Sequence, residues 1–317
     1  MTGTGDGNDL TLRGVCILVL VSFIWGLNFV VIHLGLRHFP PLLFSALRFL
    51  FCALPWIFIV PKPKISLRSL LSLGIVLGIL VFVGLFVGMH EGVPAGIASL
   101  TMQAQVFFTV ILGKFFLSEK PGPLQILSVF IGMFAIFAMI VIQGTVGTYD
   151  GIVLVLGGAL SWGVANIMMK KLPRVNMLGL MVWISLIPPV PLFLMSIAVD
   201  GWPTVAASLR AFDASGFMAV AYTGLLSTIF AYGMWGSMLQ RFPTTSVAPF
   251  ALLVPVFALL TAYLFLGEHY TAVQLCASAV IIGALAANIW HKKIEKAILN
   301  KKFPKNIIDT ETAGHVK

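Results

Sequence analysis

Arg48 is the residue of this sequence with the clearest capacity for binding chemistry. It lies about 10 Å along a predicted apolar helix that begins at Pro41, by the 1.5 Å rise per residue of an α-helix. A charge at that depth in hydrocarbon costs at least about 3 kcal/mol, so it normally faces a partner or an aqueous pathway. No acidic residue lies in the middle of a predicted apolar segment, and Glu91, Glu119 and Glu268 all lie at segment ends. Arg48 is therefore a candidate site for an anionic ligand group such as a carboxylate. Bonding to backbone carbonyls or snorkelling to the interface is the alternative.

Neutral amide side chains recur inside other apolar segments. Asn28 lies three residues after Trp25, and Asn166 lies four residues after Trp162. Amides donate and accept hydrogen bonds, so they suit a zwitterionic ligand, and tryptophans this far inside a segment could wall a pathway. Interhelical hydrogen bonding and packing explain such residues equally well. The candidate binding residues are Trp25, Asn28, Arg48, Gln103, Gln105, Trp162, Asn166 and Trp235.

The composition requires a membrane around these residues. Of the 317 residues, 59% are hydrophobic and 10% charged, against about 45–50% and about 25% in ordinary soluble domains. The mean hydropathy is +1.02. A water-soluble globule is excluded, because too little polar surface is available to cover it. The net charge of +9 comes mainly from basic residues beside apolar segments and in residues 291–317, which is typical of membrane topology rather than nucleic-acid binding.

Apolar segments long enough to span about 30 Å of hydrocarbon recur between breaks rich in proline and charge. The predicted fold is an all-α membrane protein with ten transmembrane helices. Their predicted ranges are 14–35, 41–60, 70–88, 95–117, 124–142, 151–170, 176–199, 214–238, 245–266 and 270–290.

The basic residues predict the orientation of these helices. An even number of spans places both termini on one side of the membrane, and only Arg37 and Arg210 fall on the other side. The positive-inside rule then predicts a multi-pass protein of the cell (inner) membrane with both termini cytoplasmic. The basic residues on the side of the termini are Arg13, Lys62, Lys64, Arg68, Lys120, Lys170, Lys171, Arg174, Arg241, Lys292, Lys293, Lys296, Lys301, Lys302, Lys305 and Lys317.

Two stretches of the sequence occur twice. Residues 14–26 (GVCILVLVSFIWG) align without gaps with 151–163 (GIVLVLGGALSWG), and 108–119 (FTVILGKFFLSE) align with 257–268 (FALLTAYLFLGE). Each half holds five predicted spans, an odd number, so a duplicated half would enter the membrane upside down. This predicts two inverted five-helix repeats, at 14–142 and 151–290, between tails at 1–13 and 291–317, with a binding site near mid-membrane. Chance similarity between apolar helices is the alternative.

Glycine and proline patterns predict close packing and a kink. Segment 70–88 carries two small-xxx-small pairs, which permit close helix approach: Gly74, Gly78, Gly84 and Gly88. Segment 176–199 carries three prolines that interrupt its hydrogen-bond ladder: Pro188, Pro189 and Pro191.

Missing motifs argue against several function classes. The sequence has no P-loop, HExxH or GxSxG motif, so ATP-driven transport by this chain alone and intramembrane proteolysis have no visible residues to perform them, and an enzyme is not predicted. Cys16, Cys52 and Cys276 lie in separate apolar segments without CxxC or a histidine cluster. Neither a disulfide framework nor a metal site is expected, and no cofactor is predicted.

The sequence resembles the drug/metabolite transporter superfamily with paired EamA domains over about residues 14–290. The resemblance rests on IWGLNF (24–29), SWGVAN (161–166), ALRF (46–49) and the FLSE and FLGE endings. The stretches WGLNFVVI, PPLLFSALRF and GVPAGIASLTMQAQVFFTVILG are similar to the O-acetylserine/cysteine exporters of that superfamily. Two departures are Val106, where the second repeat has Pro255, and the lysine-rich tail. The resemblance implies a ten-helix exporter of small amino-acid metabolites without a soluble cofactor.

The function predicted on this basis is a secondary transporter of cysteine, O-acetylserine or related amino acids that works by alternating access. Arg48 would attract the carboxylate, and the amide side chains would bind the amine and the polar side chain. The expected partners are the small-molecule substrate and the lipid bilayer, with no nucleic acid; the oligomeric state is not predicted. The alternatives are a carrier for a nucleobase, another amino acid or a drug, and a non-transporting membrane scaffold. A cationic drug is disfavoured because no carboxylate lies in the middle of a segment.

Residues that could couple transport to protons are scarce. Proton-driven carriers usually place Asp, Glu or His in the pathway, and the middle of every predicted span lacks all three. His33 and Glu91, near the non-cytoplasmic ends of their segments, are the possible coupling residues. The prediction is facilitated diffusion or exchange, with coupling through His33 or Glu91 as the alternative.

Overall fold

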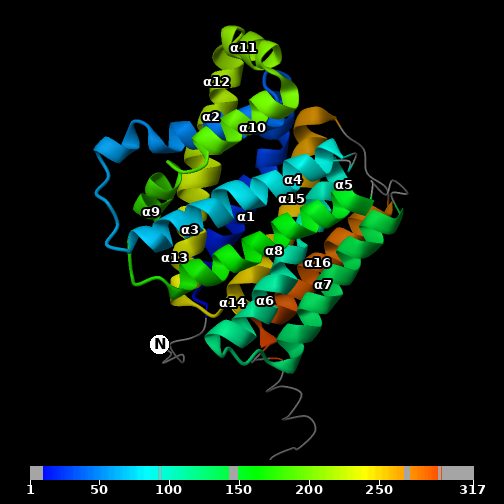
Figure 1. Ribbon diagram of the computed structural model, residues 1–317. Coiled ribbons are helices and arrows are strands. Elements are labelled where there is room, and N and C mark those ends of the chain that lie inside the picture. The colour runs from blue at the N-terminus through cyan, green and yellow to red at the C-terminus, as the bar shows by residue number, and fades with distance from the viewer. Residues whose placement is uncertain are drawn as a thin grey trace, which may run out of the picture.

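The computed structural model describes residues 10–91, 93, 95–142, 149–267, 272–291 and 294, and every regular element in these ranges is helical (Figure 1). The helices of the first half are α1 (Leu12–Gly35), α2 (Pro41–Ala53), α3 (Leu67–Leu73), α4 (Val81–His90), α5 (Ala95–Met102), α6 (Ala104–Leu117) and α7 (Pro123–Ile142). Those of the second half are α8 (Tyr149–Lys171), α9 (Met177–Ile184), α10 (Pro189–Asp200), α11 (Trp202–Arg210), α12 (Ala214–Ala221), α13 (Gly233–Arg241), α14 (Thr244–Val247), α15 (Leu253–Leu266) and α16 (Ala272–Ile289). π-Helical stretches join α3 to α4 (Gly74–Leu80) and α12 to α13 (Tyr222–Tyr232), and 3-10 turns occur at Trp56–Phe58 and Ala248–Leu252.

Within the described ranges, seven helical stretches are long and apolar enough to cross a membrane: Leu12–Gly35, Pro41–Phe58, Leu67–Gly88, Leu100–Leu117, Tyr149–Lys171, Ala214–Arg241 and Thr244–Leu266. The pair α9 and α10, bent by 43°, makes an eighth if it is one span. In the two remaining predicted ranges, held by α7 and α16, the apolar stretches are shorter, Pro123–Ala135 and Leu275–Ile289. The all-α membrane architecture is confirmed, and the count of ten spans stays a prediction.

The first helices of the two halves run in opposite directions. Gly14, near the start of α1, lies against the Phe242 ring, since an added Cβ would be 3.5 Å from it. Lys170, at the end of α8, donates a hydrogen bond to the Phe242 carbonyl. The start of α1 and the end of α8 therefore meet at one face of the bundle. We call it the N-terminal face. The other end of the bundle, where α1 ends, is called the opposite face.

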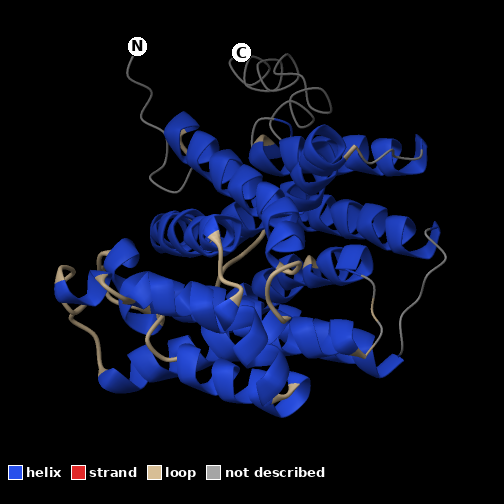
Figure 2. Cartoon of the chain, turned by 90° about the horizontal axis from the view of Figure 1, so that it is seen from above, coloured by secondary structure: helices blue, strands red, loops and turns tan. Residues whose placement is uncertain are grey.

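Each half packs its first helix into the other half. α1 packs against α15 and the π-helical stretch Tyr222–Tyr232, while α8 packs against α6 and α4 of the first half. α2 packs against α10, and α7 against α16. Figure 2 shows the same bundle from above, with helices joined by short loops. This exchange of equivalent helices is the packing expected of a duplicated, inverted chain.

The glycine and proline predictions are confirmed. A Cβ added to Gly88 of α4 would lie 2.6 Å from the Gly151 carbonyl oxygen of α8, so the two helices touch through their backbones. α9 ends at Ile184 and α10 begins at Pro189, with the 43° bend between them. Pro188 at this bend packs against the first half, because a Cβ on Gly78 would lie 2.2 Å from Pro188 Cγ.

Large apolar side chains also cover the outside of the bundle. Phe115, Phe134 and Leu194 are among those exposed. An apolar exterior of this extent is out of place in water and suits a surface facing lipid.

Candidate substrate-binding site

A cavity lies in the middle of the bundle, between the two halves. Its walls come from α1, α2, α4 and the α5–α6 junction of the first half, and from α8, α15 and the π-helical stretch Tyr222–Tyr232 of the second. The lining is mostly apolar and aromatic with a few convergent polar groups, as in most small-molecule sites. Five of the eight predicted binding residues line it: Trp25, Asn28, Arg48, Gln103 and Trp162.

Arg48 reaches the cavity from α2 and is 3% exposed. Its Nη2 donates a hydrogen bond to Thr228 Oγ1 at 2.7 Å, and the guanidinium carbon lies 4.6 Å from the centre of the Phe82 ring. Its buried Nε has no hydrogen-bond partner in the described part of the chain. The ion pairs found among the described residues involve other side chains. Arg48 is thus a buried cation, oriented by a hydroxyl and a ring, with its buried Nε donor left unpaired among the described residues.

Two further buried atoms of the cavity residues are unsatisfied. Asn28 Oδ1 on α1 and Trp162 Nε1 on α8 have no hydrogen-bond partner within the described ranges. Leaving a buried polar atom unpaired costs about 1–3 kcal/mol, so these two atoms can each gain from a hydrogen bond to a bound ligand. Together with Arg48 Nε, the unpaired buried atoms of the lining are two donors and one acceptor. A carboxylate would satisfy the donors, and an ammonium group would satisfy the acceptor.

Aromatic rings close the cavity on the side of the N-terminal face. The Trp25 ring lies 5.4 Å from Trp162, 5.0 Å from Tyr232 and 5.2 Å from Trp235, centre to centre. Trp25 is further fixed by a hydrogen bond from its Nε1 to the Ser227 carbonyl at 3.1 Å. Phe29 and Ile32, one and two turns further along α1, line the cavity on the other side of this cluster. The cavity therefore extends from mid-bundle toward the opposite face.

The three other predicted binding residues form a separate buried cluster. Asn166 Nδ2 donates to Gln105 Oε1 at 3.1 Å and to Thr109 Oγ1 at 2.9 Å, and Trp235 Nε1 donates to Asn166 Oδ1 at 2.9 Å. Asn166, Gln105 and Trp235 are all fully buried, and none lines the cavity. In this conformation they connect α6, α8 and α13, and their binding of substrate stays a prediction.

The two possible coupling residues lie outside the cavity lining. His33 is exposed near the end of α1, with its Nε2 3.4 Å from Arg37 Nη2. Glu91 is exposed and follows the end of α4. Proton coupling through either residue stays the alternative to the predicted uncoupled transport.

Sequence reasoning missed the partners of Arg48. Thr228 holds its guanidinium group, and Tyr232 and Phe82 stand beside it in the cavity. The Ser-Thr pair at 227–228, inside an apolar run, was a signal that could have found Thr228. Tyr232 and Phe82 lie among many aromatic residues and carried no such signal.

Comparison with known proteins identifies the family of this chain. The sequence pattern of the EamA-like transporter family matches the chain twice, over residues 12–141 and 150–290. The chain belongs to this family. This EamA-like chain is 38% identical over 284 residues to a protein named "Probable amino-acid metabolite efflux pump" from Salmonella typhimurium strain LT2, covering 88% of this chain and 95% of that protein. A protein of the same name from Escherichia coli strain K12 is 38% identical over 286 residues, covering 88% and 96%.

More distant similarities are to another named transporter and to a solved structure of the same fold. The "Uncharacterized inner membrane transporter YedA" of Escherichia coli strain K12 is 26% identical over 276 residues, covering 84% of this EamA-like chain and 88% of that protein. A solved crystal structure superposes with a TM-score of 0.71 at 16% sequence identity, covering 87% of this chain and 96% of the other. The latter shows that the fold is shared. The family and these relatives support a metabolite-transporting membrane protein, since the relatives are named as efflux pumps or transporters.

Proposed function

We propose that this protein is a secondary transporter that exports small amino-acid metabolites, of the size of cysteine or O-acetylserine, by alternating access. The observation that carries the proposal is the set of unsatisfied atoms in the cavity: the donors Arg48 Nε and Trp162 Nε1, and the acceptor Asn28 Oδ1. An α-amino acid carries one carboxylate and one ammonium group, and so complements this set. The names of the 38% identical relatives support the same class of cargo.

The rest of the lining limits the cargo's side chain. Phe82, Leu85, Phe86 and Met102 supply apolar walls, and among the described residues Arg48 is the one charged side chain of the lining. A second carboxylate or a second amine on the cargo would enter without a counter-charge, which is costly in a buried site. The favoured substrates therefore have a small neutral side chain.

The proposed architecture has ten transmembrane helices in two inverted five-helix repeats, with α7 and α16 as the fifth helix of each. The N-terminal face is proposed to be cytoplasmic, which agrees with the lysines and arginines beside the segments that end there. In this orientation the cavity extends toward the outer side. The proposed role is transport without catalysis, coupled to no ion, by exchange or facilitated diffusion.

A counterflow assay in proteoliposomes tests the proposal. Vesicles loaded with an unlabelled solute are given a trace of labelled solute, across a panel of amino acids, O-acetylserine, nucleosides and quaternary amines. We expect counterflow of neutral amino acids and its loss in Arg48→Gln. Counterflow of nucleosides or quaternary amines instead would contradict the substrate class, and no flux of any solute would favour a scaffold.

A further inference from the structure

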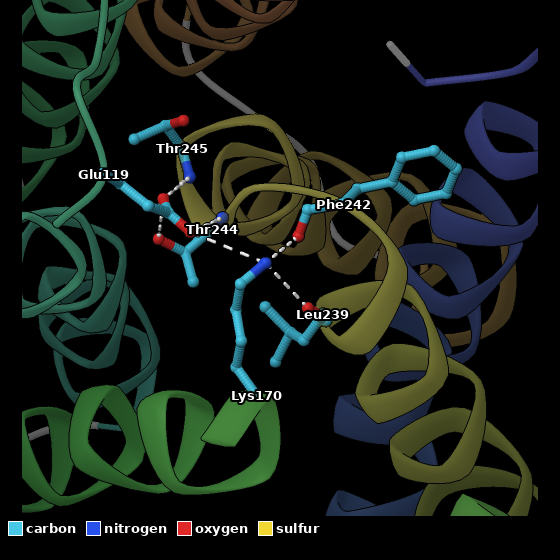
Figure 3. Close-up of polar contacts among 6 residues, drawn as sticks. All are labelled: Glu119, Lys170, Leu239, Phe242, Thr244 and Thr245. Carbon is cyan, nitrogen blue, oxygen red and sulfur yellow. Dashed lines mark hydrogen bonds and ion pairs between the residues drawn. The ribbon is translucent and has the colours of Figure 1, made fainter. Parts of the chain in front are cut away.

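Two charged residues hold the turn between α13 and α14 at the N-terminal face (Figure 3). Glu119, just after α6, accepts hydrogen bonds from the Thr244 backbone amide at 2.9 Å and from the Thr244 hydroxyl at 2.7 Å. Lys170, at the end of α8, donates to the backbone carbonyl of Leu239 at 3.0 Å and to that of Phe242. Lys170 Nζ also lies 3.5 Å from Glu119 Oε1. One backbone turn is thus bound by a lysine at its carbonyls and by a glutamate at its amides.

The cluster is mostly withdrawn from water. The side chain of Glu119 is 11% exposed and that of Lys170 19%. Desolvated charges are stable only when nearly all their hydrogen bonds are made, as they are here. Gly113 lets α6 come this close, because a Cβ there would lie 2.4 Å from Thr244 Oγ1. The sequence thus permits a tight contact between α6 and α14 at this position.

Three of the helices that meet in this cluster, α6, α8 and α13, run from it to the cavity. Gln103 lies at the start of α6 and Trp162 within α8, while Tyr232 precedes α13. The ring cluster and the Asn166 hydrogen bonds lie along these helices between the cavity and the face. A route from the cavity to the N-terminal face must therefore separate α6 and α8 from α13 and α14, and the contacts of Glu119 and Lys170 span that separation.

We propose that Glu119 and Lys170 form a latch that keeps the cavity closed toward the N-terminal face and releases once in each transport cycle. The inference rests on the proposed alternating-access function. An ionic latch suits this position, since the face borders water and both charges become hydrated when the contact opens, rather than being stranded in hydrocarbon. The latch also has a fixed direction, with the ammonium group on carbonyls and the carboxylate on an amide and a hydroxyl. Exchanging the two residues would place a carboxylate against carbonyls and an ammonium group against amides, so a charge swap does not restore it.

The test measures access from the N-terminal face to a buried reporter. Val106 is fully buried on α6, between the cavity and the latch. In a chain whose three cysteines, Cys16, Cys52 and Cys276, are replaced by serine, Val106→Cys is labelled with a membrane-impermeant thiol reagent supplied only at the N-terminal face. We expect Glu119→Gln and Lys170→Gln each to raise the labelling rate about tenfold. The labelling rate follows the open fraction, so this corresponds to an about tenfold shift of the open–closed equilibrium.

Control variants separate the latch from a general loss of stability. Lys171→Gln removes the neighbouring, exposed lysine and should leave the labelling rate unchanged. Lys170→Arg keeps the charge and the donors and should keep labelling slow, while the double variant Glu119→Lys with Lys170→Glu should label as fast as the single variants. Thermal unfolding of each variant identifies any that is simply unfolded, and labelling from the opposite face should not rise.

The outcomes distinguish this inference from the substrate assignment, because labelling needs no substrate. Unchanged labelling in folded Glu119→Gln and Lys170→Gln proteins would overturn the latch, even if counterflow of amino acids succeeds. Equal increases from both faces would also overturn it, since they indicate loosening of the whole bundle. Increased labelling from the N-terminal face alone supports the latch, whatever solute the counterflow assay identifies.

Discussion

Gly84 of α4 and Gly158 of α8 meet backbone to backbone, so that a Cβ on Gly84 would lie 2.8 Å from the Gly158 amide nitrogen. The atoms that this Cβ would meet belong to the backbone of α8, so they cannot move aside as a flexible side chain could. α4 lines the cavity with Phe82 and Phe86, and α8 lines it with Trp162. The glycine contact therefore sets the distance between two walls of the substrate site, and a side chain there would move one wall relative to the other.

Replacing Gly84 by valine should destabilise the fold. Inserting carbon atoms into a filled contact typically costs about 1–3 kcal/mol. The measurement is thermal unfolding in detergent, followed by tryptophan fluorescence. Gly157→Ala is the matched control, because it lies one position away from the contact on α8 and a Cβ there meets nothing within 4 Å. An unchanged melting temperature in Gly84→Val would show that the two helices are not in close contact.

Much of the fold could be predicted from the sequence because the relevant signals are local. Run length, prolines and charges marked the helix boundaries, and helices occupy each of the predicted ranges. Burial of Arg48, Asn28 and Gln103 could also be predicted. A polar side chain in a membrane-spanning helix is costly where it faces lipid, so it faces the interior of the bundle.

The division of the polar residues into two sites could not be predicted. Gln103 and Gln105 are two residues apart, yet one lines the cavity and the other bonds Asn166. Residues two apart on a helix point to different sides, but the sequence does not show which side faces the cavity and which faces Asn166. The latch was missed for a different reason. Glu119 and Thr244 are 125 positions apart, and no local pattern pairs them.

The second prediction concerns how Arg48 recognises a carboxylate. Arg48→Lys keeps a positive charge but loses the planar fork, the geometry of the hydrogen bond to Thr228 and the stacking on Phe82. Hydrogen bonds to charged groups are worth about 1.5–3 kcal/mol, so substrate affinity should fall about ten- to a hundredfold. Arg48→Gln should abolish counterflow of carboxylate substrates. Thr228→Val is the control, because it removes the hydrogen bond that orients Arg48 and leaves the charge in place. Its substrate affinity should lie between those of the wild type and Arg48→Lys. Wild-type transport by a folded Arg48→Gln protein would remove Arg48 from the site.

Two tryptophans of the cavity should respond differently to loss of the indole N–H. Trp162 Nε1 is unpartnered among the described residues, whereas Trp25 Nε1 donates to the Ser227 carbonyl at 3.1 Å. Trp162→Phe should therefore lower substrate affinity by about two- to tenfold, the value of one neutral hydrogen bond, with a smaller loss of stability than Trp25→Phe. Trp25→Phe should lower the melting temperature, because it removes the hydrogen bond from the indole to the Ser227 carbonyl. Binding titrations and thermal unfolding of the two variants check the contrast. The opposite pattern would place the substrate away from Trp162.

A fourth prediction concerns acid stability at the opposite face. Asp213 caps α12, and its Oδ1 accepts the Gly216 amide at 2.8 Å. This hydrogen bond, assisted by the Ser215 hydroxyl and by His38, lowers the pKa of the Asp213 carboxyl in the folded protein. The carboxylate therefore stabilises the fold above its unfolded pKa of about 3.9, and the contribution disappears as the pH falls through the lower folded value.

The measurement is the melting temperature between pH 6 and pH 3. Asp213→Asn keeps an acceptor oxygen for the cap but does not titrate, so its melting temperature should fall less steeply than that of the wild type below about pH 4. Parallel curves for the two proteins would show that the cap carries no charge-dependent stability.

The last prediction concerns energy coupling. A proton-driven carrier needs a titratable group whose surroundings change as the site alternates, and within the described ranges the cavity lining contains no Asp, Glu or His. His33 and Glu91 are exposed and lie outside that lining. We therefore expect no net accumulation when proteoliposomes with equal substrate inside and outside are given a pH gradient of either sign, although labelled substrate still exchanges. Accumulation that collapses with a protonophore would contradict the uncoupled mechanism. Its disappearance in His33→Gln or in Glu91→Gln, with exchange intact, would then identify which residue carries the proton, because only the coupled step requires that residue to titrate.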